Sequence, residues 1–306
     1  MFCFSARLAP MNMDSAKIGM EGKHQQTLGM AAMVACAFCW SLAGIFIKLI
    51  DWQPFAIAGG RSAIAAVFIF LFLKGKPKFS FSVAQILCAM AYAATMLLFV
   101  FANKTTTSAN AILLQYGAPI YVAFMSAVVL KEPPKAEDWL ALVGICGGMV
   151  LFFIDSLGKG NMIGDVAAVA SGVAFALNIV LLRKQRGVRP LDSLLLGHIF
   201  TAIVAGAISL FLPAPIVTMK SIFAIGCLGV IQIGLAAVLF SYSLQRITAL
   251  QSVLLAVIEP LFNPVWVFLA TREAPGFRSM LGGLVIIATV LASSFVSVRR
   301  TAKAIR

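Results

Sequence analysis

Residues 248–275 read TALQSVLLAVIEPLFNPVWVFLATREAP, and one carboxylate, Glu259, lies inside the long apolar run of this stretch. Pro260 follows the acid directly, and Asn263 and Pro264 interrupt the run again one turn later. About 20 apolar residues are enough for a helix to cross a bilayer. Proline frees backbone carbonyls, which survive in lipid only against protein or a wet cavity. The stretch therefore predicts a membrane-spanning helix that is kinked at mid-length and whose acid faces inward.

The same pattern occurs upstream in residues 107–134, which read TSANAILLQYGAPIYVAFMSAVVLKEPP. An ungapped alignment of the two stretches pairs Thr107 with Thr248, Leu113 and Leu114 with Leu254 and Leu255, Pro119 with Pro260, Glu132 with Glu273, and Pro134 with Pro275. With an offset smaller by five residues, Lys48 also pairs with Lys184, and Pro54 with Pro190. The second half of the chain is therefore interpreted as a copy of the first half.

The composition of the chain is that of a protein that lies in lipid. Of its 306 residues, 61% are hydrophobic and 11% are charged, whereas soluble domains are about half apolar and a quarter charged. The net charge of +13 would suit nucleic-acid binding, but the charges lie in short loops and tails between apolar runs. Anchoring charges of membrane proteins occupy such places, so we expect no nucleic acid as a partner.

Loop signals divide the chain into ten apolar segments, which predicts an all-α membrane protein with about ten transmembrane helices. The segments are 29–50, 54–73, 83–103, 107–130, 138–156, 162–182, 191–212, 221–244, 247–270 and 277–298. Each copy holds five segments, so the second copy enters the membrane from the opposite side, as in the inverted repeats of secondary transporters. The expected organisation is a cytoplasmic tail (1–28), a first five-helix repeat (29–156), a second, inverted five-helix repeat (157–298) and a basic cytoplasmic tail (299–306).

The lysines and arginines predict the orientation of the chain. If the N-terminus is cytoplasmic, the inner loops and tails carry nearly three times as many Lys and Arg residues as the outer ones, with clusters at 74–78 and 183–189. Cytoplasmic loops carry this excess in membrane proteins. We therefore expect a multi-pass protein of the inner, or cytoplasmic, membrane with both termini in the cytoplasm.

Several short motifs recur in an order that is specific when they are taken together. They are Trp40 in CAFCWSLAG, Arg61 in AGGRSAIAA, the mid-helix prolines Pro119 and Pro260, Glu132 in VVLKE, and Glu273 in LATRE. Over nearly its whole length the chain resembles the drug/metabolite transporter superfamily in its ten-helix EamA-type branch. The resemblance implies alternating access through a central cavity lined mainly by the first, third, fourth, sixth, eighth and ninth helices. It does not identify the substrate, because members move amino acids, other metabolites, amines and drugs.

The chain departs from its own repeat at two positions. Gly197-His198 stands where the second copy would carry Arg61-Ser62, and Ala118 stands where the first copy would carry Glu259. The charge at the centre of the predicted bundle is therefore one-sided.

Glu259 is the leading candidate for substrate binding. Ser252, Glu259 and Asn263 are spaced by seven and four residues, so they share one helical face, and a charge at mid-bilayer costs about 2.5–3.5 kcal/mol. This stripe predicts cavity lining, and the alternative is that Glu259 is a structural part of the proline kink. The other substrate-binding candidates are Gln115, Tyr116, Trp40, Tyr92, Asn178, Gln232 and Tyr242. Trp40, Tyr92 and Tyr242 would form an aromatic wall of the cavity, and the alternative is that their rings only pack. The alternative for the buried amides is that they only join helices.

Other conspicuous residues are assigned structural roles. Pro119 and Pro260 would kink their helices, Arg61 would hold backbone carbonyls or a carboxylate, Glu132 and Glu273 would organise loops, and His198, Cys36 and Cys39 would pack. Gly144 and Gly148 would allow close contact with the last segment, 277–298. The sequence contains no phosphate-binding loop, metal-ligand cluster or Ser-His-Asp set, so no cofactor and no metal are expected.

The expected function is secondary or facilitative transport of a small organic metabolite, an amino acid, an amine or a drug-like solute, by alternating access. The alternatives are an intramembrane enzyme and a membrane assembly protein that does not transport. Glu259 would bind a cationic or amine-bearing substrate, or a proton that competes with it. The expected partners are the small-molecule substrate and the lipid bilayer, and we favour a monomer over an oligomer.

Overall fold

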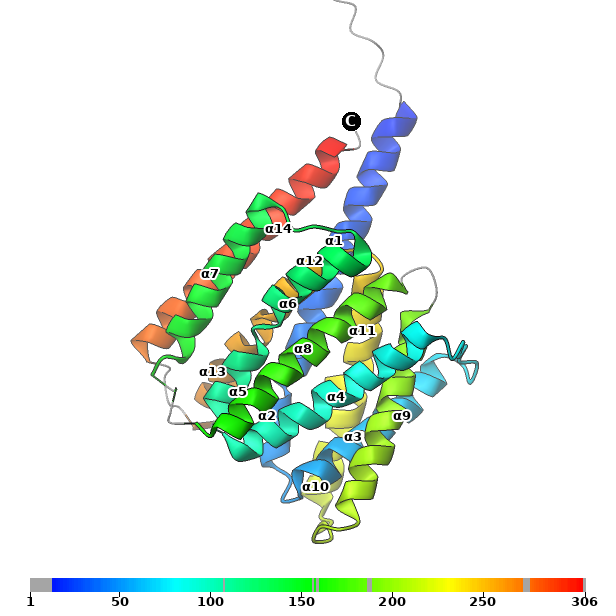
Figure 1. Ribbon diagram of the computed structural model, residues 1–306, viewed down its shortest axis with the longest axis vertical. Coiled ribbons are helices and arrows are strands. Elements are labelled where there is room, and N and C mark those ends of the chain that lie inside the picture. The colour runs from blue at the N-terminus through cyan, green and yellow to red at the C-terminus, as the bar shows by residue number, and fades with distance from the viewer. Residues whose placement is uncertain are drawn as a thin grey trace, which may run out of the picture.

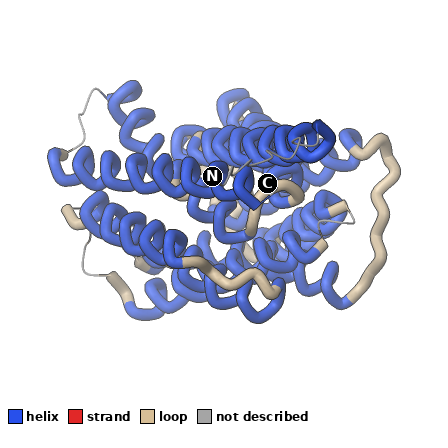
Figure 2. The backbone as a smooth tube through the Cα atoms, turned by 90° about the horizontal axis from the view of Figure 1, so that it is seen from above, coloured by secondary structure: helices blue, strands red, loops and turns tan. Residues whose placement is uncertain are grey.

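The computed structural model describes residues 13–106, 108–155, 157, 160–185, 189–271 and 276–304, and this part of the chain contains helices and no strand. Eight helical stretches within it are long and apolar enough to cross a membrane. Two further stretches, α1–α2 and α12–α13, cover most of the first and ninth predicted segments, but α1 begins at Met13, well before the predicted start at residue 29. The predicted fold class, an all-α membrane protein with about ten helices, is confirmed. The beginning of α1 and the end of α14 lie at the same end of the bundle (Figure 1, Figure 2), which we call the terminal end.

The helices follow one another in two groups. The first group is α1 (Met13–Ser41), α2 (Ala43–Lys48), α3 (Pro54–Phe72), α4 (Val83–Thr105), α5 (Ser108–Gln115), α6 (Ala118–Met125), the π-helix η1 (Ser126–Leu130) and α7 (Ala136–Phe153). The second group is α8 (Met162–Lys184), α9 (Pro190–Ser209), α10 (Met219–Cys227), the π-helix η2 (Leu228–Leu235), α11 (Ala236–Leu244), α12 (Ala249–Ala256), α13 (Ile258–Thr271) and α14 (Phe277–Ala304).

The ends of the helices follow local sequence rules. Pro54 and Pro190 occupy the first turns of α3 and α9, where the missing amide donor would have no partner within the helix. The side chain of Thr248 accepts a hydrogen bond from the backbone N–H of Gln251, whose own side chain accepts from the Thr248 N–H. This capping box satisfies two donors at the start of α12. Lys131 adopts a left-handed conformation with φ of 56° and ends η1.

Helices α7 and α14 pack closely along one edge of the bundle (Figure 1). A Cβ added at Gly148 would lie 2.7 Å from the Ile286 side chain, and one added at Gly144 would lie 2.7 Å from the Thr289 hydroxyl. These distances are too short for any residue larger than glycine, so the two glycines set the separation of the helices. The predicted contact of Gly144 and Gly148 with the last segment is confirmed.

Three of the spans are broken near their middle. A turn at Leu42 separates α1 from α2, a turn at Tyr116 and Gly117 separates α5 from α6, and a turn at Val257 separates α12 from α13. The eighth span is continuous but contains η2 at mid-length. Interrupted helices at mid-membrane expose backbone groups and commonly line the binding sites of transporters. Prolines predict two of these breaks, and the break at Leu42 was not predicted.

Candidate functional site

The breaks of the fourth and ninth spans meet through one short hydrogen bond. Tyr116, which ends the first part of the fourth span, donates its hydroxyl to Glu259 Oε2 over 2.6 Å. Glu259 lies in the first turn of α13, where the positive end of the helix dipole stabilises a carboxylate. The acid is partly accessible, whereas its neighbour Pro260 is buried. Two residues predicted separately to bind substrate are thus in direct contact.

Each of the two mid-helix prolines lies just after a break. Pro119 is in the first turn of α6, and Pro260 is in the first turn of α13. At these positions proline costs no helical hydrogen bond. The second part of each span therefore begins at a fixed place and points its N-terminus toward the middle of the bundle.

Arg61 lies in α3 with 8% of its surface exposed and reaches two side chains. Its Nη1 donates to Gln232 Oε1 over 3.3 Å, and its Nη2 is 3.6 Å from the Met96 sulfur. Gln232 in turn donates to the backbone carbonyl of Trp40 over 3.5 Å. The partners predicted for Arg61 were backbone carbonyls or a carboxylate. The guanidinium instead contacts a neutral amide and a thioether. A charged group is thus buried with uncharged acceptors only.

Two features of η2 bring Gln232 to Arg61. The wider π-helical turn presents Gln232 from the middle of the span, and π-helical segments are frequent at functional sites. A Cβ added at Gly229 would lie 2.5 Å from the Ile64 side chain and 3.1 Å from the Arg61 carbonyl. Glycine at this position therefore allows η2 to approach the turn of α3 that carries the arginine.

Arg61 and Glu259 carry opposite charges on two different helices, α3 and α13, and do not form an ion pair. The ion pairs among the described residues are formed by other groups. Each of the two charges instead contacts uncharged side chains, Gln232 and Met96 for Arg61 and Tyr116 for Glu259.

Tyr92 and His198 form a second polar contact beside Arg61. The Tyr92 hydroxyl is 3.2 Å from His198 Nε2, and the two rings meet edge to face with centroids 4.8 Å apart. A Cβ added at Gly197 would lie 2.9 Å from the Tyr92 ring, so the glycine makes room for the tyrosine. His198 is fully buried and its Nδ1 has no hydrogen-bond partner. The pair joins α4 to α9 and completes the polar side of the site.

The predicted aromatic wall is divided by the structure. Trp40 packs edge to face against Phe240 and Phe175, with centroids 5.3 Å and 6.1 Å apart. Tyr242 lies elsewhere, 37% exposed, with the Arg246 guanidinium 3.4 Å above its ring. The aromatic surface beside Gln232 therefore consists of Trp40 and two phenylalanines that sequence reasoning did not select.

The remaining substrate-binding candidates mostly join helices. Asn178 is fully buried and donates to the Cys88 carbonyl over 3.0 Å, which connects α8 to α4. Gln115 donates to the Ser171 hydroxyl over 2.8 Å. Ser252 donates to the Thr248 carbonyl of its own helix over 3.0 Å and is buried, and the turn at Val257 separates it from Glu259. The side chain of Asn263 and all of Glu273 lie outside the described residues.

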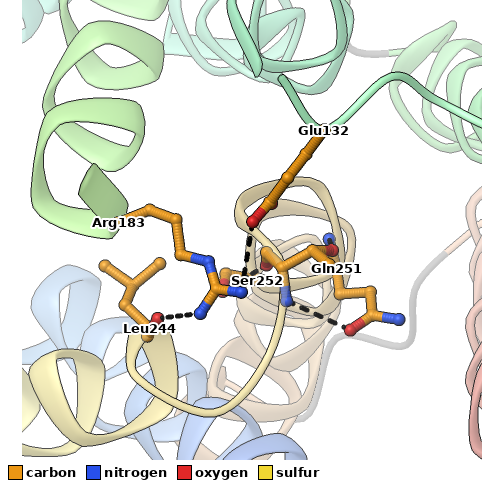
Figure 3. Close-up of polar contacts among 6 residues, drawn as sticks. Glu132, Arg183, Leu244, Gln251 and Ser252 are labelled. Atoms are coloured by element: carbon orange, nitrogen blue, oxygen red, sulfur yellow. Dashed lines mark hydrogen bonds and ion pairs between the residues drawn. The ribbon is translucent and has the colours of Figure 1, made fainter. Parts of the chain in front are cut away.

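A second cluster of polar residues lies at the terminal end of the bundle (Figures 1 and 3). Arg183, at the end of α8, contacts Glu132 over 3.4 Å and donates to the Leu244 carbonyl over 2.7 Å. Figure 3 shows the capped start of α12, with Gln251 and Ser252, beside them. Glu132 follows η1, so its predicted position at a helix end is observed. The cluster connects the ends of the fourth, sixth and eighth spans.

Two polar contacts near the centre were not found by sequence reasoning. Trp266 in α13 donates its ring N–H to the Ser41 hydroxyl over 3.1 Å, next to the break at Leu42. Met96 contacts Arg61. Trp266 lies one turn after Asn263 within residues 248–275, so its position was a usable signal, whereas nothing in the sequence marks Met96. Within the described part of the chain, no group of three or more His, Cys, Asp or Glu residues could hold a metal ion.

The spans, the mid-membrane breaks and the buried charges define a multi-pass membrane protein of the transporter class. A family model described as the EamA-like transporter family matches residues 27–154 and again residues 162–295. The chain therefore belongs to the EamA-like transporter family.

Named relatives agree with this assignment, and a solved structure shares the fold. The transporter YcxC of Bacillus subtilis is 25% identical over 303 residues, covering 91% of this chain and 96% of the relative. A transporter of Archaeoglobus fulgidus is 26% identical over 266 residues, covering 82% of this chain and 92% of the relative. Human solute carrier family 35 member G1 is 24% identical over 176 residues, covering 52% of this chain and 48% of the relative. A crystal structure with a TM-score of 0.77 and 16% identity covers 89% of this chain and 98% of its own, and it shares the fold. Together, the family and the named relatives indicate a membrane transporter and not an enzyme.

Proposed function

We propose that the protein transports a small organic solute with an ammonium group, an amino acid, an amine or a drug-like molecule, by secondary or facilitated alternating access. The observation that carries the proposal is the Tyr116–Glu259 hydrogen bond, which joins the breaks of two spans at mid-membrane. A carboxylate in this place binds either a substrate ammonium or a proton that competes with it. Movement of the two broken spans relative to each other would then open the acid to each side in turn.

The packing of the helices supports two related halves that can exchange conformations. Helix α4 packs on α8 and α9, and the eighth span packs in the same way on α1 and α3. Helices α5 and α6 pack on α8 as α12 and α13 pack on α1, while α7 with α14 and α3 with α9 join equivalent members. The alignment that pairs Pro119 with Pro260 also pairs Tyr116 with Val257, so the breaks occupy equivalent positions. The two separate family matches, to residues 27–154 and 162–295, support a division of the chain between α7 and α8.

We further propose a monomer in the cytoplasmic membrane with both termini inside the cell. The excess of Lys and Arg at the terminal end of the bundle supports this orientation. Single cysteines in the loop 74–78, in a variant without native cysteines, should resist impermeant maleimide added to intact cells. Labelling from outside would contradict the orientation.

Solute counterflow in proteoliposomes tests the function. Amines and amino acids that raise the thermal stability of the purified protein would be supplied as labelled solutes. We expect the unmodified protein and Asp155→Asn to accumulate label, because Asp155 pairs with Arg278 at the surface, and Glu259→Gln to lose accumulation. If Glu259→Gln transports normally at every pH while Glu259→Ala fails to fold, Glu259 is part of the kink and the proposal is wrong.

A further inference from the structure

Arg61 is a buried cation whose hydrogen-bonding capacity is only partly used. Its two terminal nitrogens contact the Gln232 amide and the Met96 sulfur, and its Nε has no hydrogen-bond partner. A thioether is a weak acceptor, and an amide oxygen carries no full charge. Buried arginines are normally compensated by a carboxylate or another anion, often through two parallel hydrogen bonds. Arg61 is thus arranged as one half of an ion pair.

Glu259 does not supply the missing half. Its Oε2 accepts the Tyr116 hydroxyl, and no hydrogen bond or ion pair among the described residues joins the acid to Arg61. Opposite charges in a low-dielectric interior attract strongly. Their separation is therefore imposed by the different helices that carry them, α3 and α13.

We infer that Arg61 binds an anionic group of the solute, so that the transported molecule is dipolar, with its anion at Arg61 and its ammonium at Glu259. This inference rests on the proposed function of Glu259 and extends it by a second subsite. A dipolar solute satisfies both charges and leaves the net charge of the site unchanged. An amine alone would add a positive charge beside an arginine, and a carboxylate alone would add a negative charge beside a glutamate. The two subsites together select molecules that carry both groups.

The surroundings of Arg61 fit a subsite and not a structural anchor. The guanidinium is positioned by Gln232, which is held in turn by the Trp40 carbonyl. The aromatic ring of Trp40, with Phe240 and Phe175, lies next to this chain of contacts and offers an apolar surface to the rest of the solute. Tyr92 lies one turn before Met96 in α4, and its hydroxyl contacts His198.

Matched ligands test the inference without relying on a variant. The probes are alanine, leucine and phenylalanine, each with the amine that lacks its carboxylate and the acid that lacks its amine: ethylamine and propionate, 3-methylbutylamine and 4-methylpentanoate, 2-phenylethylamine and 3-phenylpropionate. Binding to the purified full-length protein is measured by calorimetry at one pH. In at least one set the dipolar member should bind about 10- to 100-fold more tightly than either analogue, as expected for a hydrogen bond to a charged group. An amine that binds as tightly as its dipolar parent in every set would overturn the inference, and so would a failure of all nine probes to bind.

Variants then assign each ligand group to one residue. Arg61→Gln should lower the affinity for the dipolar ligand to that of the amine and leave the affinity for the amine unchanged. Glu259→Gln should lower the affinity for the dipolar ligand to that of the acid analogue and leave the affinity for the acid analogue unchanged. Arg278→Gln, at an exposed ion pair, is the matched control and should change neither. Equal weakening of dipolar ligand and amine by Arg61→Gln would show that Arg61 is structural. If Arg61→Gln does not fold, Arg61→Lys keeps the charge but not the paired donors, and it should reduce the preference for the dipolar ligand.

Failure of this inference can be told apart from failure of the proposed function. If Glu259→Gln abolishes amine binding but dipolar and amine ligands bind alike, only the anion subsite is wrong. If Glu259→Gln leaves amine binding intact, the proposed role of Glu259 is wrong as well.

Discussion

Two pairs of charged residues connect the two halves of the chain, and they are built differently. At the terminal end, Arg183 contacts Glu132 over 3.4 Å and also donates to the Leu244 carbonyl. In the middle of the bundle, Arg61 and Glu259 do not contact each other, and each hydrogen-bonds to neutral side chains. The first pair is in contact, and the two residues of the second pair are not.

The difference separates two uses of buried charge. In a contacting pair each charge neutralises the other, so the pair holds helices together. Removing one partner leaves the other charge uncompensated. Two separated charges do not neutralise each other, so each can bind an oppositely charged group of another molecule. We therefore expect changes at the end cluster to lower stability, and changes at the centre to alter ligand binding and transport.

The largest effect is expected for Glu259→Gln on the pH dependence of transport. In the unmodified protein a proton on Glu259 removes the charge that binds the ammonium, so transport should fall as the pH is lowered through the pKa of the acid. The variant has no such group, so its residual transport should be much lower and independent of pH. Counterflow in proteoliposomes from pH 5 to pH 8 measures both effects. A pH profile that survives the substitution would assign the titration to another residue.

Arg183→Gln should have the largest effect on stability. It leaves Glu132 without this cation and the Leu244 carbonyl without this donor, and a buried polar group that loses its partner costs about 1–3 kcal/mol. Thermal unfolding followed by size-exclusion chromatography would measure the loss. Ligand preference within the matched sets should not change, and a changed preference would show that the end cluster takes part in binding.

Tyr116→Phe should have an intermediate effect, limited to the centre. It removes the hydroxyl that donates to Glu259 and keeps the ring, and a hydrogen bond to a charged group makes a net contribution of about 1.5–3 kcal/mol. Because Glu259 is partly accessible, we expect only a 3- to 10-fold change in amine affinity, about 1 kcal/mol. Calorimetry with the amine probes measures it, and a fall in thermal stability without a change in affinity would make the bond structural.

Glu132→Gln should have the smallest effect. The Glu132 side chain is 28% exposed, and ion pairs near solvent contribute about 0.2–1 kcal/mol. Arg183 keeps the Leu244 carbonyl as an acceptor. A stability loss equal to that of Arg183→Gln would mean that the ion pair, and not the bond to the carbonyl, holds the cluster.

Sequence reasoning located the spans because long apolar runs leave few alternatives in a bilayer. It also anticipated the tight contact made by Gly144 and Gly148, since small residues spaced four apart mark close helix packing. Pro119 and Pro260 predicted the breaks near Tyr116 and Val257. The break at Leu42 has no proline beside it, so this signal was absent there.

The candidate site was only partly predictable, because its key contacts join residues far apart in the chain. Arg61 and Gln232 were each noticed, but only the fold places them 3.3 Å apart. Tyr242 was expected in the aromatic wall, yet the helical turn that carries it faces Arg246 and the surface. A single aromatic residue does not show which face of its helix is inward, so this part of the site required the structure.

The π-helix η2 makes the length of the eighth span as important as its composition. Hydrogen bonds in a π-helix close over one residue more than in an α-helix, so the segment holds a residue that α-helical geometry would not accommodate. Deleting one residue from Leu228–Leu235 would let the segment relax to α-helical geometry. Each residue of an α-helix turns the chain by about 100°, so the change in register would carry Gln232 away from Arg61 while the hydropathy of the span stayed the same. Gaps in this segment are therefore more damaging than conservative replacements, which makes its residue count a trait that natural variants of the protein should preserve.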